Sequence, residues 1–316
     1  MSRQTEKVFR EMDAYLAAHQ DEIHGDADVE RLVTAFMEEH NAAVHSAFGA
    51  ERNGEMTADD WLEKAEKESS GKKRLECIRK ALALEPENLD AVCMEIGEEC
   101  GKDYELLRER YSAALLHADE IMRRDGWFAQ ENIGDFWGFP ETRPYMRLRF
   151  AYFAALIGCG RIGAAIREGR EMLRLCENDN MGIRYRLMHL YAMLEDKKSM
   201  LALHRRYEQY DETQMLLPLS VVFYKTGEAE KAKEYLLRLF AVNPDTKKFI
   251  HRINRGELDF LDEIAYELGY RPFSTEELAA EFRENAALFA FIPGYFSWAD
   301  RELSAIKGKT GRKKKG

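Results

Sequence analysis

The stretch that decides the fold is residues 219–246, LSVVFYKTGEAEKAKEYLLRLFAVNPDT. Two apolar helical segments flank Gly227, and Ala232, Leu239 and Pro244 follow it at steps of five, seven and five residues. The same steps separate four residues that lie 67 positions earlier, namely Gly160, Ala165, Met172 and Glu177. This offset is close to two periods of roughly 34 residues, the length of stacked helix–turn–helix repeats. The sequence therefore predicts a helical solenoid, in which each repeat buries a core against its neighbours.

Three helix ends share one pattern. Apolar helices stop at Leu84, Leu175 and Val242, and each is followed by Pro or polar residues that break the helix before the next one begins. Pro is otherwise rare, and alternating strand patterns are almost absent. We therefore expect an all-α fold with four parts: an N-terminal helical hairpin (1–50), helical repeats (57–250), a C-terminal helical cap (251–306) and a disordered basic tail (307–316).

The region beyond residue 250 is expected to add helices at 256–268, 274–289 and 295–306. Ser274 and Glu277 have the spacing of a capping box at the start of the second of these helices. The aromatic residues near its end and in the third helix are expected to close the end of the repeat array.

The net charge limits which classes of partner the chain is expected to bind. The chain carries a formal charge of −10, but its last ten residues, KGKTGRKKKG, hold six basic and no acidic residues. The remaining residues 1–306 therefore hold 41 basic and 57 acidic residues, a balance of −16. An acidic surface repels phosphate, so we expect nucleic acid to bind only through the C-terminal tail, if at all.

Other whole-chain features point to a protein without a cofactor. No apolar run is long enough to form a transmembrane segment, and the first residues lack the apolar core of a signal peptide, so a cytoplasmic location is expected. Five cysteines without a C-x-x-C pair indicate buried, reduced thiols and no zinc site. No motif for nucleophilic, nucleotide-dependent or metal-dependent catalysis is present, so we expect no metal, no cofactor and no enzymatic activity.

Residues 219–246 resemble a tetratricopeptide repeat, with Gly227 at the turn, a small Ala232, a bulky Leu236 and a closing Pro244. Weaker matches are 149–178, with Glu177 in place of Pro, and 72–88 as a lone second helix, while 181–210 is periodic but lacks the glycine and alanine landmarks. The stretches 136–147 and 177–185 are similar to uncharacterised bacterial repeat proteins. The resemblance implies a right-handed α-solenoid of irregular hairpins with extra helices at both ends. It also implies a scaffold or adaptor that binds a protein or peptide on its concave face.

The central segment 141–186 is rich in arginine, with nine Arg and no Lys against five acidic residues. Arginine binds carboxylates through two parallel hydrogen bonds, which suits an acidic peptide. In the register of the tetratricopeptide family, the first helix of each repeat faces the groove. The predicted partner-binding residues are Arg147, Arg186, Gln214 and Lys225, with Arg143 and Trp137 at the edge of a neighbouring loop. Alternatively, the arginines pair with Glu168, Glu171 and Asp179 on a solvated face.

Two other functions remain open. Arg184 and His189 have the R-x4-H spacing of certain small helical ribonucleases, so the chain could bind or cleave RNA with this pair and the basic tail. The alternative is that His189 is a buried or groove-lining histidine. The aromatic segment 125–145 interrupts the repeats. It is expected to be tucked against the helices, or else its residues 127–145 dock the chain into a larger complex as a structural subunit.

Overall fold

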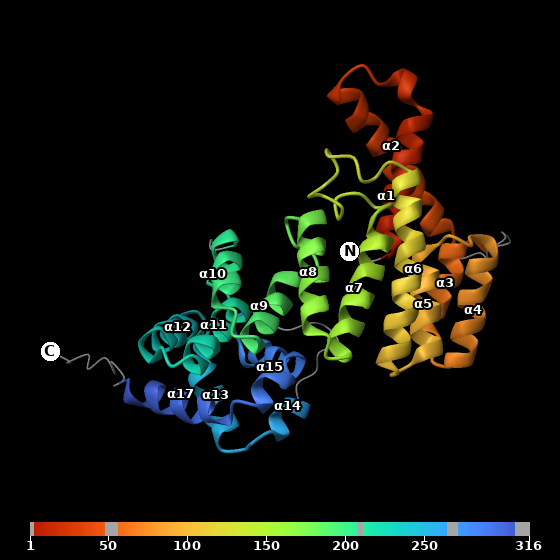
Figure 1. Ribbon diagram of the computed structural model, residues 1–316. Helices are drawn as coiled ribbons and strands as arrows, with labels where there is room; N and C mark the ends of the chain where they lie inside the picture. Colours follow the sequence, from red (N-terminus) through yellow and green to blue (C-terminus); the bar gives the residue numbers. More distant parts are fainter. Residues whose placement is uncertain (1–2, 48–55, 208–210, 264–270, 307–316) are drawn as a thin grey trace. The chain divides into compact units, whose positions relative to one another are not determined.

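The chain is all-α, as the sequence predicts. The computed structural model describes residues 3–47, 56–207, 211–263 and 271–306, and these form seventeen α-helices, one short 3-10 helix (Gln20–Glu22) and two isolated β-bridges, with no β-strand among them (Figure 1). The helices divide into two compact units, residues 1–180 and 181–316. This boundary falls inside the segment 57–250, which we expected to hold helical repeats interrupted by an aromatic loop at 125–145.

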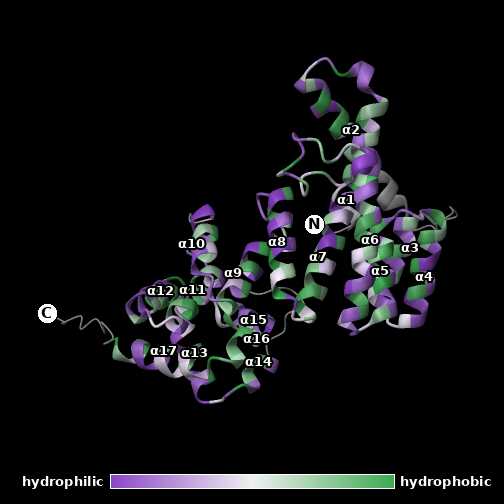
Figure 2. Ribbon diagram, viewed as in Figure 1, coloured by the Kyte–Doolittle hydropathy of each residue, from purple (hydrophilic) through white to green (hydrophobic). Residues whose placement is uncertain are grey.

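The described residues of the first unit form eight helices: α1 (Arg3–Ala18), α2 (Asp26–Ala47), α3 (Ala58–Lys67), α4 (Gly71–Leu84), α5 (Leu89–Cys100), α6 (Tyr104–Arg124), α7 (Arg143–Gly158) and α8 (Ile162–Leu175). From α3 to α8, each helix packs against the next one in the chain, and α5 also packs against α7. Helices α1 and α2 pack against each other, and α1 also contacts α3. Both colours appear on nearly every helix in Figure 2, as expected of helices with one buried face.

In the second unit, the part of the chain that the structure describes forms nine helices: α9 (Ile183–Met193), α10 (Lys197–Arg206), α11 (Thr213–Lys225), α12 (Ala229–Val242), α13 (Thr246–Asn254), α14 (Asp259–Glu263), α15 (Thr275–Glu284), α16 (Ala286–Ala290) and α17 (Pro293–Ala305). Helix α11 lies at the centre, because it packs against α9, α10, α12 and α15. Eleven consecutive residues of α11, Thr213–Phe223, are buried. Such burial on all sides requires neighbours around the whole helix.

The 67-residue offset corresponds to two helical hairpins. Gly160 ends α7 and Gly227 ends α11, both with a left-handed backbone (φ 67° and 78°). In each turn the amide of the following residue donates to a carbonyl five residues back, Arg161 to Leu156 and Glu228 to Phe223, both at 2.9 Å. This is the Schellman pattern, which satisfies carbonyls at the end of a helix.

In the sequence, the hairpin α9–α10 comes between these two, and its turn has the same backbone conformation. Its turn residue is Glu195, which adopts the same left-handed conformation (φ 58°), and the amide of Asp196 donates to Tyr191 at 2.9 Å. Five residues after the turn, Met200 is fully buried where the other hairpins have Ala165 and Ala232, which are also fully buried. The landmarks that the sequence of 181–210 lacks are therefore replaced by other residues in the same backbone positions.

The three helix exits also share one backbone conformation. Glu85, Cys176 and Asn243 are extended, with φ between −137° and −122° and ψ between 87° and 92°. Each amide still donates to the carbonyl four residues back, at 2.8–2.9 Å. The predicted common pattern is confirmed, and it does not require Pro, because Glu177 follows Cys176 where Pro follows the other two.

The C-terminal helices differ from the predicted ranges. The expected helix 274–289 is divided at Asn285 into α15 and α16, and the third helix begins at Pro293, whose fixed φ suits a first helical turn. Ser274 caps α15 by accepting from the amide of Glu277, as predicted, although the Glu277 carboxylate accepts from the amide of Phe273. The predicted range 256–268 contains α14 and residues outside the described part of the chain. The basic tail 307–316 also lies outside it.

None of the helices in the described ranges is long and apolar enough to cross a membrane.

Candidate functional site

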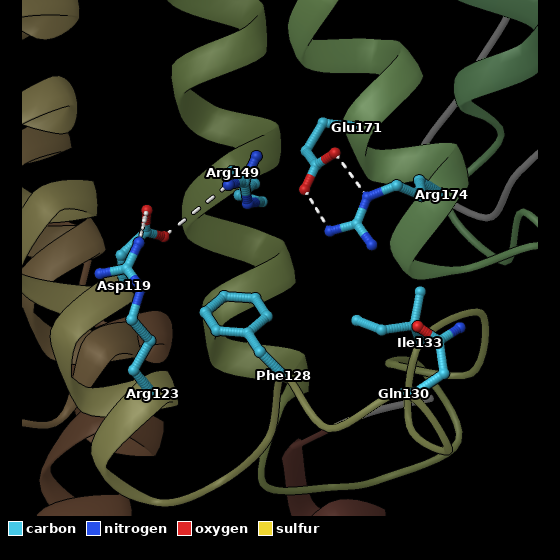
Figure 3. Close-up of a pocket in the computed structure, with 8 residues that line it drawn as sticks. All are labelled: Asp119, Arg123, Phe128, Gln130, Ile133, Arg149, Glu171 and Arg174. Carbon is cyan, nitrogen blue, oxygen red and sulfur yellow. Dashed lines mark hydrogen bonds and ion pairs between the residues drawn. The ribbon is translucent and has the colours of Figure 1, made fainter.

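The first unit contains a cavity of about 390 Å³, which we call the arginine pocket. Helix α6, helix α7, helix α8 and the loop that joins α6 to α7 contribute its walls. The lining residues are Asp119, Arg123, Phe128, Gln130, Ile133, Arg149, Glu171 and Arg174. Figure 3 shows Phe128 between Arg123 and Ile133, with Arg149 and Arg174 on the neighbouring helices.

The loop between α6 and α7 is held in place by backbone hydrogen bonds to the end of α8. The amides of Gly134 and Phe136 donate to the carbonyl of Leu175 at 3.2 and 2.9 Å, and the amide of Glu177 donates to Gly134 at 2.7 Å. Phe136 is fully buried, and its ring lies 5.7 Å from that of Phe128. The aromatic segment is therefore tucked against the helices, as expected, and its burial positions Phe128 in the pocket.

Arg149 forms the rigid part of the pocket. Its side chain is largely buried and donates to Glu168 at 2.6 Å and to the hydroxyl of Tyr145 at 2.7 Å. Tyr145, also buried, in turn donates to Asp119 at 2.7 Å. Burial alone would lower the pKa of Arg149, but the attraction of Glu168 and other neighbours raises it, so the guanidinium stays charged. This network fixes a positive charge at the base of the pocket.

Two more exposed arginines border the mouth. Arg174 donates to Glu171 at 2.8 and 2.7 Å, and Arg123 donates to Asp119 at 3.4 Å with its guanidinium 5.8 Å from the Phe128 ring. The hydrogen bonds from Arg174 lower the pKa of Glu171, which keeps this carboxylate ionised. The side chains of Arg123 and Arg174 are 62% and 50% exposed, so both remain accessible to a ligand.

The structure brings three of the predicted partner-binding residues together, around Glu6 of α1. Arg147 forms ion pairs with Glu6 at 2.9 Å and Asp90 at 2.6 Å, and Arg143 lies 3.6 Å from Glu6. Arg143 also donates to the carbonyl of Trp137 at 2.8 Å, and its guanidinium lies 5.8 Å from the indole ring.

The other three predicted residues lie in the second unit and have partners there. Arg186 pairs with Glu284 at 2.7 Å, and Gln214 is buried and donates to Glu277 at 3.1 Å. Lys225 donates to the last carbonyls of α9, at Ala192 (2.8 Å) and Met193 (3.2 Å). Each of these side chains stabilises the contact of two helices within its own unit.

The Arg184–His189 pair is arranged differently from a phosphate site. His189 is buried (2% exposed), and the side chain of Arg184 lies over the Tyr185 ring and pairs with Glu212 at 3.3 Å. The expectation that His189 is buried is confirmed. Burial keeps its imidazole away from an RNA backbone, so this geometry does not favour the ribonuclease alternative.

His189 instead faces a buried carboxylate. Its Nδ1 lies 2.9 Å from the carbonyl of Tyr185, which requires a proton on Nδ1, and its Nε2 lies 3.4 Å from Glu281 of α15. Burial lowers the pKa of His189 to about 4 and raises that of Glu281 to about 8. Near neutral pH Glu281 therefore keeps its proton and the imidazole of His189 is uncharged.

The alternative expectation for the arginine-rich segment is partly confirmed. Arg149 pairs with Glu168, and Arg174 pairs with Glu171. Sequence reasoning missed the contribution of α6, since Asp119 and Arg123 lie outside the segment 141–186. The signal available was the aromatic loop itself, because the loop joins α6 to the arginine-rich helices.

No metal site is apparent: no group of three or more His, Cys, Asp or Glu side chains in the described ranges could hold an ion. Of the five cysteines, Cys77, Cys100 and Cys176 are buried, and Cys93 and Cys159 are partly exposed. All five are free thiols, so the expectation of reduced cysteines agrees with their placement, although two of them are not fully buried.

No protein-family model matches this chain, and no curated protein is detectably similar to it in sequence.

Proposed function

We propose that this chain is a non-catalytic scaffold that binds an acidic segment of a protein or peptide, and that its tetratricopeptide-like hairpins form a right-handed solenoid. The spacing of the left-handed turns supports the repeat: Glu195 follows Gly160 by 35 residues and precedes Gly227 by 32. Hairpins of this kind present rigid side chains, so a partner binds without the receptor having to order itself.

The observation that carries the proposed binding function is the arginine pocket. Arg123 and Arg174 are half-exposed or more, and the acidic partners that they now have, Asp119 and Glu171, are partly exposed as well. Such surface ion pairs contribute only about 0–1 kcal/mol, so a ligand carboxylate can take over some of these donors at little cost. The more deeply buried Arg149 does not have to move.

The chemistry of the lining indicates the ligand. Two guanidinium groups separated by Phe128 favour carboxylates that flank an apolar or aromatic group, because the ring supplies a stacking surface between two charges. The volume of about 390 Å³ is near the lower end for ligand pockets and fits one or two side chains of a peptide. We therefore expect a short acidic and aromatic motif to bind.

Fluorescence anisotropy with two labelled nonapeptides tests this proposal. The peptides GEFEGEFEG and GQFQGQFQG differ only in charge. We expect the glutamate peptide to bind the full chain about tenfold more tightly than the glutamine peptide, a difference of ~1.4 kcal/mol. Its affinity should fall as the salt concentration rises from about 0.05 to 0.5 M, since the pocket mouth is exposed.

The variant Arg123→Gln/Arg174→Gln should lose about tenfold in affinity for the glutamate peptide. The matched control Lys102→Gln/Arg167→Gln removes the same charge from two exposed side chains outside the pocket and should bind like the wild type. Equal binding of both peptides, or equal binding by the pocket variant and the control, would show that the pocket does not bind acidic segments.

A further inference from the structure

Helix α1 is attached to the first unit in an unusual way. Among residues 5–18, only Glu6 is buried, and it is a charged residue. Helix α1 makes an aromatic contact with α2, where the Tyr15 ring lies 5.6 Å from that of Phe36. Figure 1 shows α2 extending away from α3 and α4. Ion pairs join α1 to α3, α5 and α7.

The Glu6 carboxylate lies against side chains of α5 and α7. Both of its oxygens accept from Nη1 of Arg147, at 2.9 and 3.0 Å, while Nε and Nη2 of the same guanidinium donate to Asp90. Arg143 lies one helical turn away and approaches Glu6 to 3.6 Å. The side chains of Glu6, Arg143 and Asp90 are each less than 10% exposed.

Glu6 and Asp90 supply two negative charges beside the guanidinium groups of Arg143 and Arg147. Removing the Glu6 carboxylate would take one of these charges away from two guanidinium groups in a poorly solvated site, which is unfavourable. Burial alone would lower the pKa of Arg147, but hydrogen bonds from its guanidinium to Asp90 and Glu6 raise it, so the arginine keeps its charge. The site therefore has affinity for a carboxylate.

Two further ion pairs define what surrounds that carboxylate. Lys7 pairs with Asp60 at 3.1 Å, and Arg10 pairs with Asp59 at 2.6 Å, both on the first turn of α3. Asp60 is held in position because it forms a capping box with Thr57. Burial would raise the pKa of Asp60, but hydrogen bonds from Thr57 and Lys7 outweigh it and lower the value to about 2. These side chains thus pair with one acidic residue of α1 and with the basic residues one and four positions after it.

We infer that Arg143, Arg147, Asp59 and Asp60, together called the α1 seat, form a binding site for a helical segment of a partner protein with the pattern Glu-Lys-x-x-Arg. Helix α1 occupies this seat until such a partner displaces it. The two flanking pairs are part-exposed and contribute little, so exchange costs mainly the Glu6 contact, which the partner replaces with its own glutamate.

The α1 seat is independent of the arginine pocket. Arg147 and Arg149 are two residues apart on α7, which places them on nearly opposite faces of the helix. Arg143 and Arg147 face α1 and α5, whereas Arg149 faces α6 and α8. Loss of peptide binding to the pocket therefore leaves binding to the α1 seat unchanged, and either proposal can fail alone.

A labelled peptide of residues 3–18, RQTEKVFREMDAYLAA, tests the inference with full-length chains. The variant Glu6→Gln/Arg10→Gln weakens the binding of the chain's own α1 to the α1 seat. We expect this variant to bind the peptide at least about tenfold more tightly than the wild type, since a tethered helix competes at an effective concentration on the order of millimolar. Asp13→Asn, which removes an exposed carboxylate of α1, should bind like the wild type.

A peptide carrying its own Glu6→Gln exchange should lose about tenfold in affinity for the variant, a factor that corresponds to ~1.4 kcal/mol. If it binds as well as the unmodified peptide, or if variant and wild type bind alike, the inference is wrong. A second measurement needs no variant: millimolar unlabelled peptide should speed hydrogen exchange of the α1 amides in the wild-type chain, and unchanged exchange would also overturn the inference.

Discussion

The hairpins α7–α8 and α11–α12 have the same backbone but different surroundings. Both turn at a left-handed glycine, bury a small alanine five residues later and end in an extended residue. At the end of α8, the backbone of the aromatic loop pairs with Leu175 and Glu177, and the arginine pocket forms beside it. At the end of α12, the buried Asn243 side chain donates instead to the carbonyl of Ser274 at 3.1 Å. The two hairpins share one framework, and the arginine pocket lies beside the exit that the aromatic loop covers.

The substitution with the largest expected effect removes a packing contact of the aromatic loop, which lies against the first hairpin only. Phe136→Ala deletes a fully buried ring that packs against Phe128 and Tyr145, so it should lower the free energy of unfolding of the first unit by about 3–5 kcal/mol. Hydrogen exchange should quicken in α7 and α8 and stay unchanged in α11 and α12. Phe139→Ala, at a partly exposed ring of the same loop, should have a smaller effect. Equal exchange in both hairpins would contradict the proposed role of the loop.

A second comparison concerns buried carboxylates. In the first unit, burial raises the pKa of Glu168, and the charge of Arg149 opposes this rise. In the second unit, burial raises the pKa of Glu281 to about 8, and the side chain that faces it is a neutral His189. Between pH 6.5 and 8 the folded chain keeps a proton that unfolded Glu281, with an ordinary pKa near 4.5, has lost. The folded state therefore loses stability as pH rises through this range, by about 2 kcal/mol in total.

The variant Glu281→Gln should remove this pH dependence, because its neutral amide replaces the protonated carboxyl. His189 has the opposite effect between pH 6.5 and about 4: its lowered pKa keeps it neutral in the folded chain while the unfolded histidine is protonated, so in this variant stability should fall as the pH falls through that range. Thermal unfolding between pH 4 and 9 measures both effects, with Glu230→Gln as a control at an exposed carboxylate of α12. A wild-type profile that is flat from pH 6.5 to 8 would contradict the assignment.

The smallest effects concern the turns that the hairpins share. Gly160→Ala and Gly227→Ala should each cost about 1 kcal/mol, because a Cβ strains a left-handed residue even though nothing lies within 4 Å of it. Glu195→Gly, in the α9–α10 hairpin, should raise the free energy of unfolding by up to about 1 kcal/mol, because glycine adopts the left-handed conformation without strain. Gly163→Ala, within α8, should be neutral or stabilising. Urea unfolding measures all four, and a similar loss at Gly163 would mean that the left-handed conformation is not the cause.

Much of the fold follows from local patterns. The turn at Gly227 and the exit at Asn243 were predictable because the hydrogen bonds that form them join residues at most five apart. The turn at Glu195 was missed because a glutamate in a left-handed conformation has no signature in the sequence. The division into two units at residues 180 and 181 was also missed, since the turns and exits on either side of it look alike.

The candidate site was less predictable. The density of arginine in 141–186 pointed to the helices that line the pocket, and the aromatic loop pointed to an interruption beside them. Which arginines face the pocket could not be read from the sequence, because neighbouring positions on α7 face different helices: Arg147 contacts Asp90 and Glu6, and Arg149 contacts Glu168.

The sequence by itself determined the helices, the turns at Gly160 and Gly227 and the charge of the central arginines, because these depend on the residues of a single turn or on composition. Only the tertiary structure decided the partner of each arginine. Arg147 and Glu6 are 141 residues apart in the chain, and an ion pair of that kind carries no local signal. Its geometry depends on the packing of α1, α5 and α7, which brings distant charges together where water is scarce.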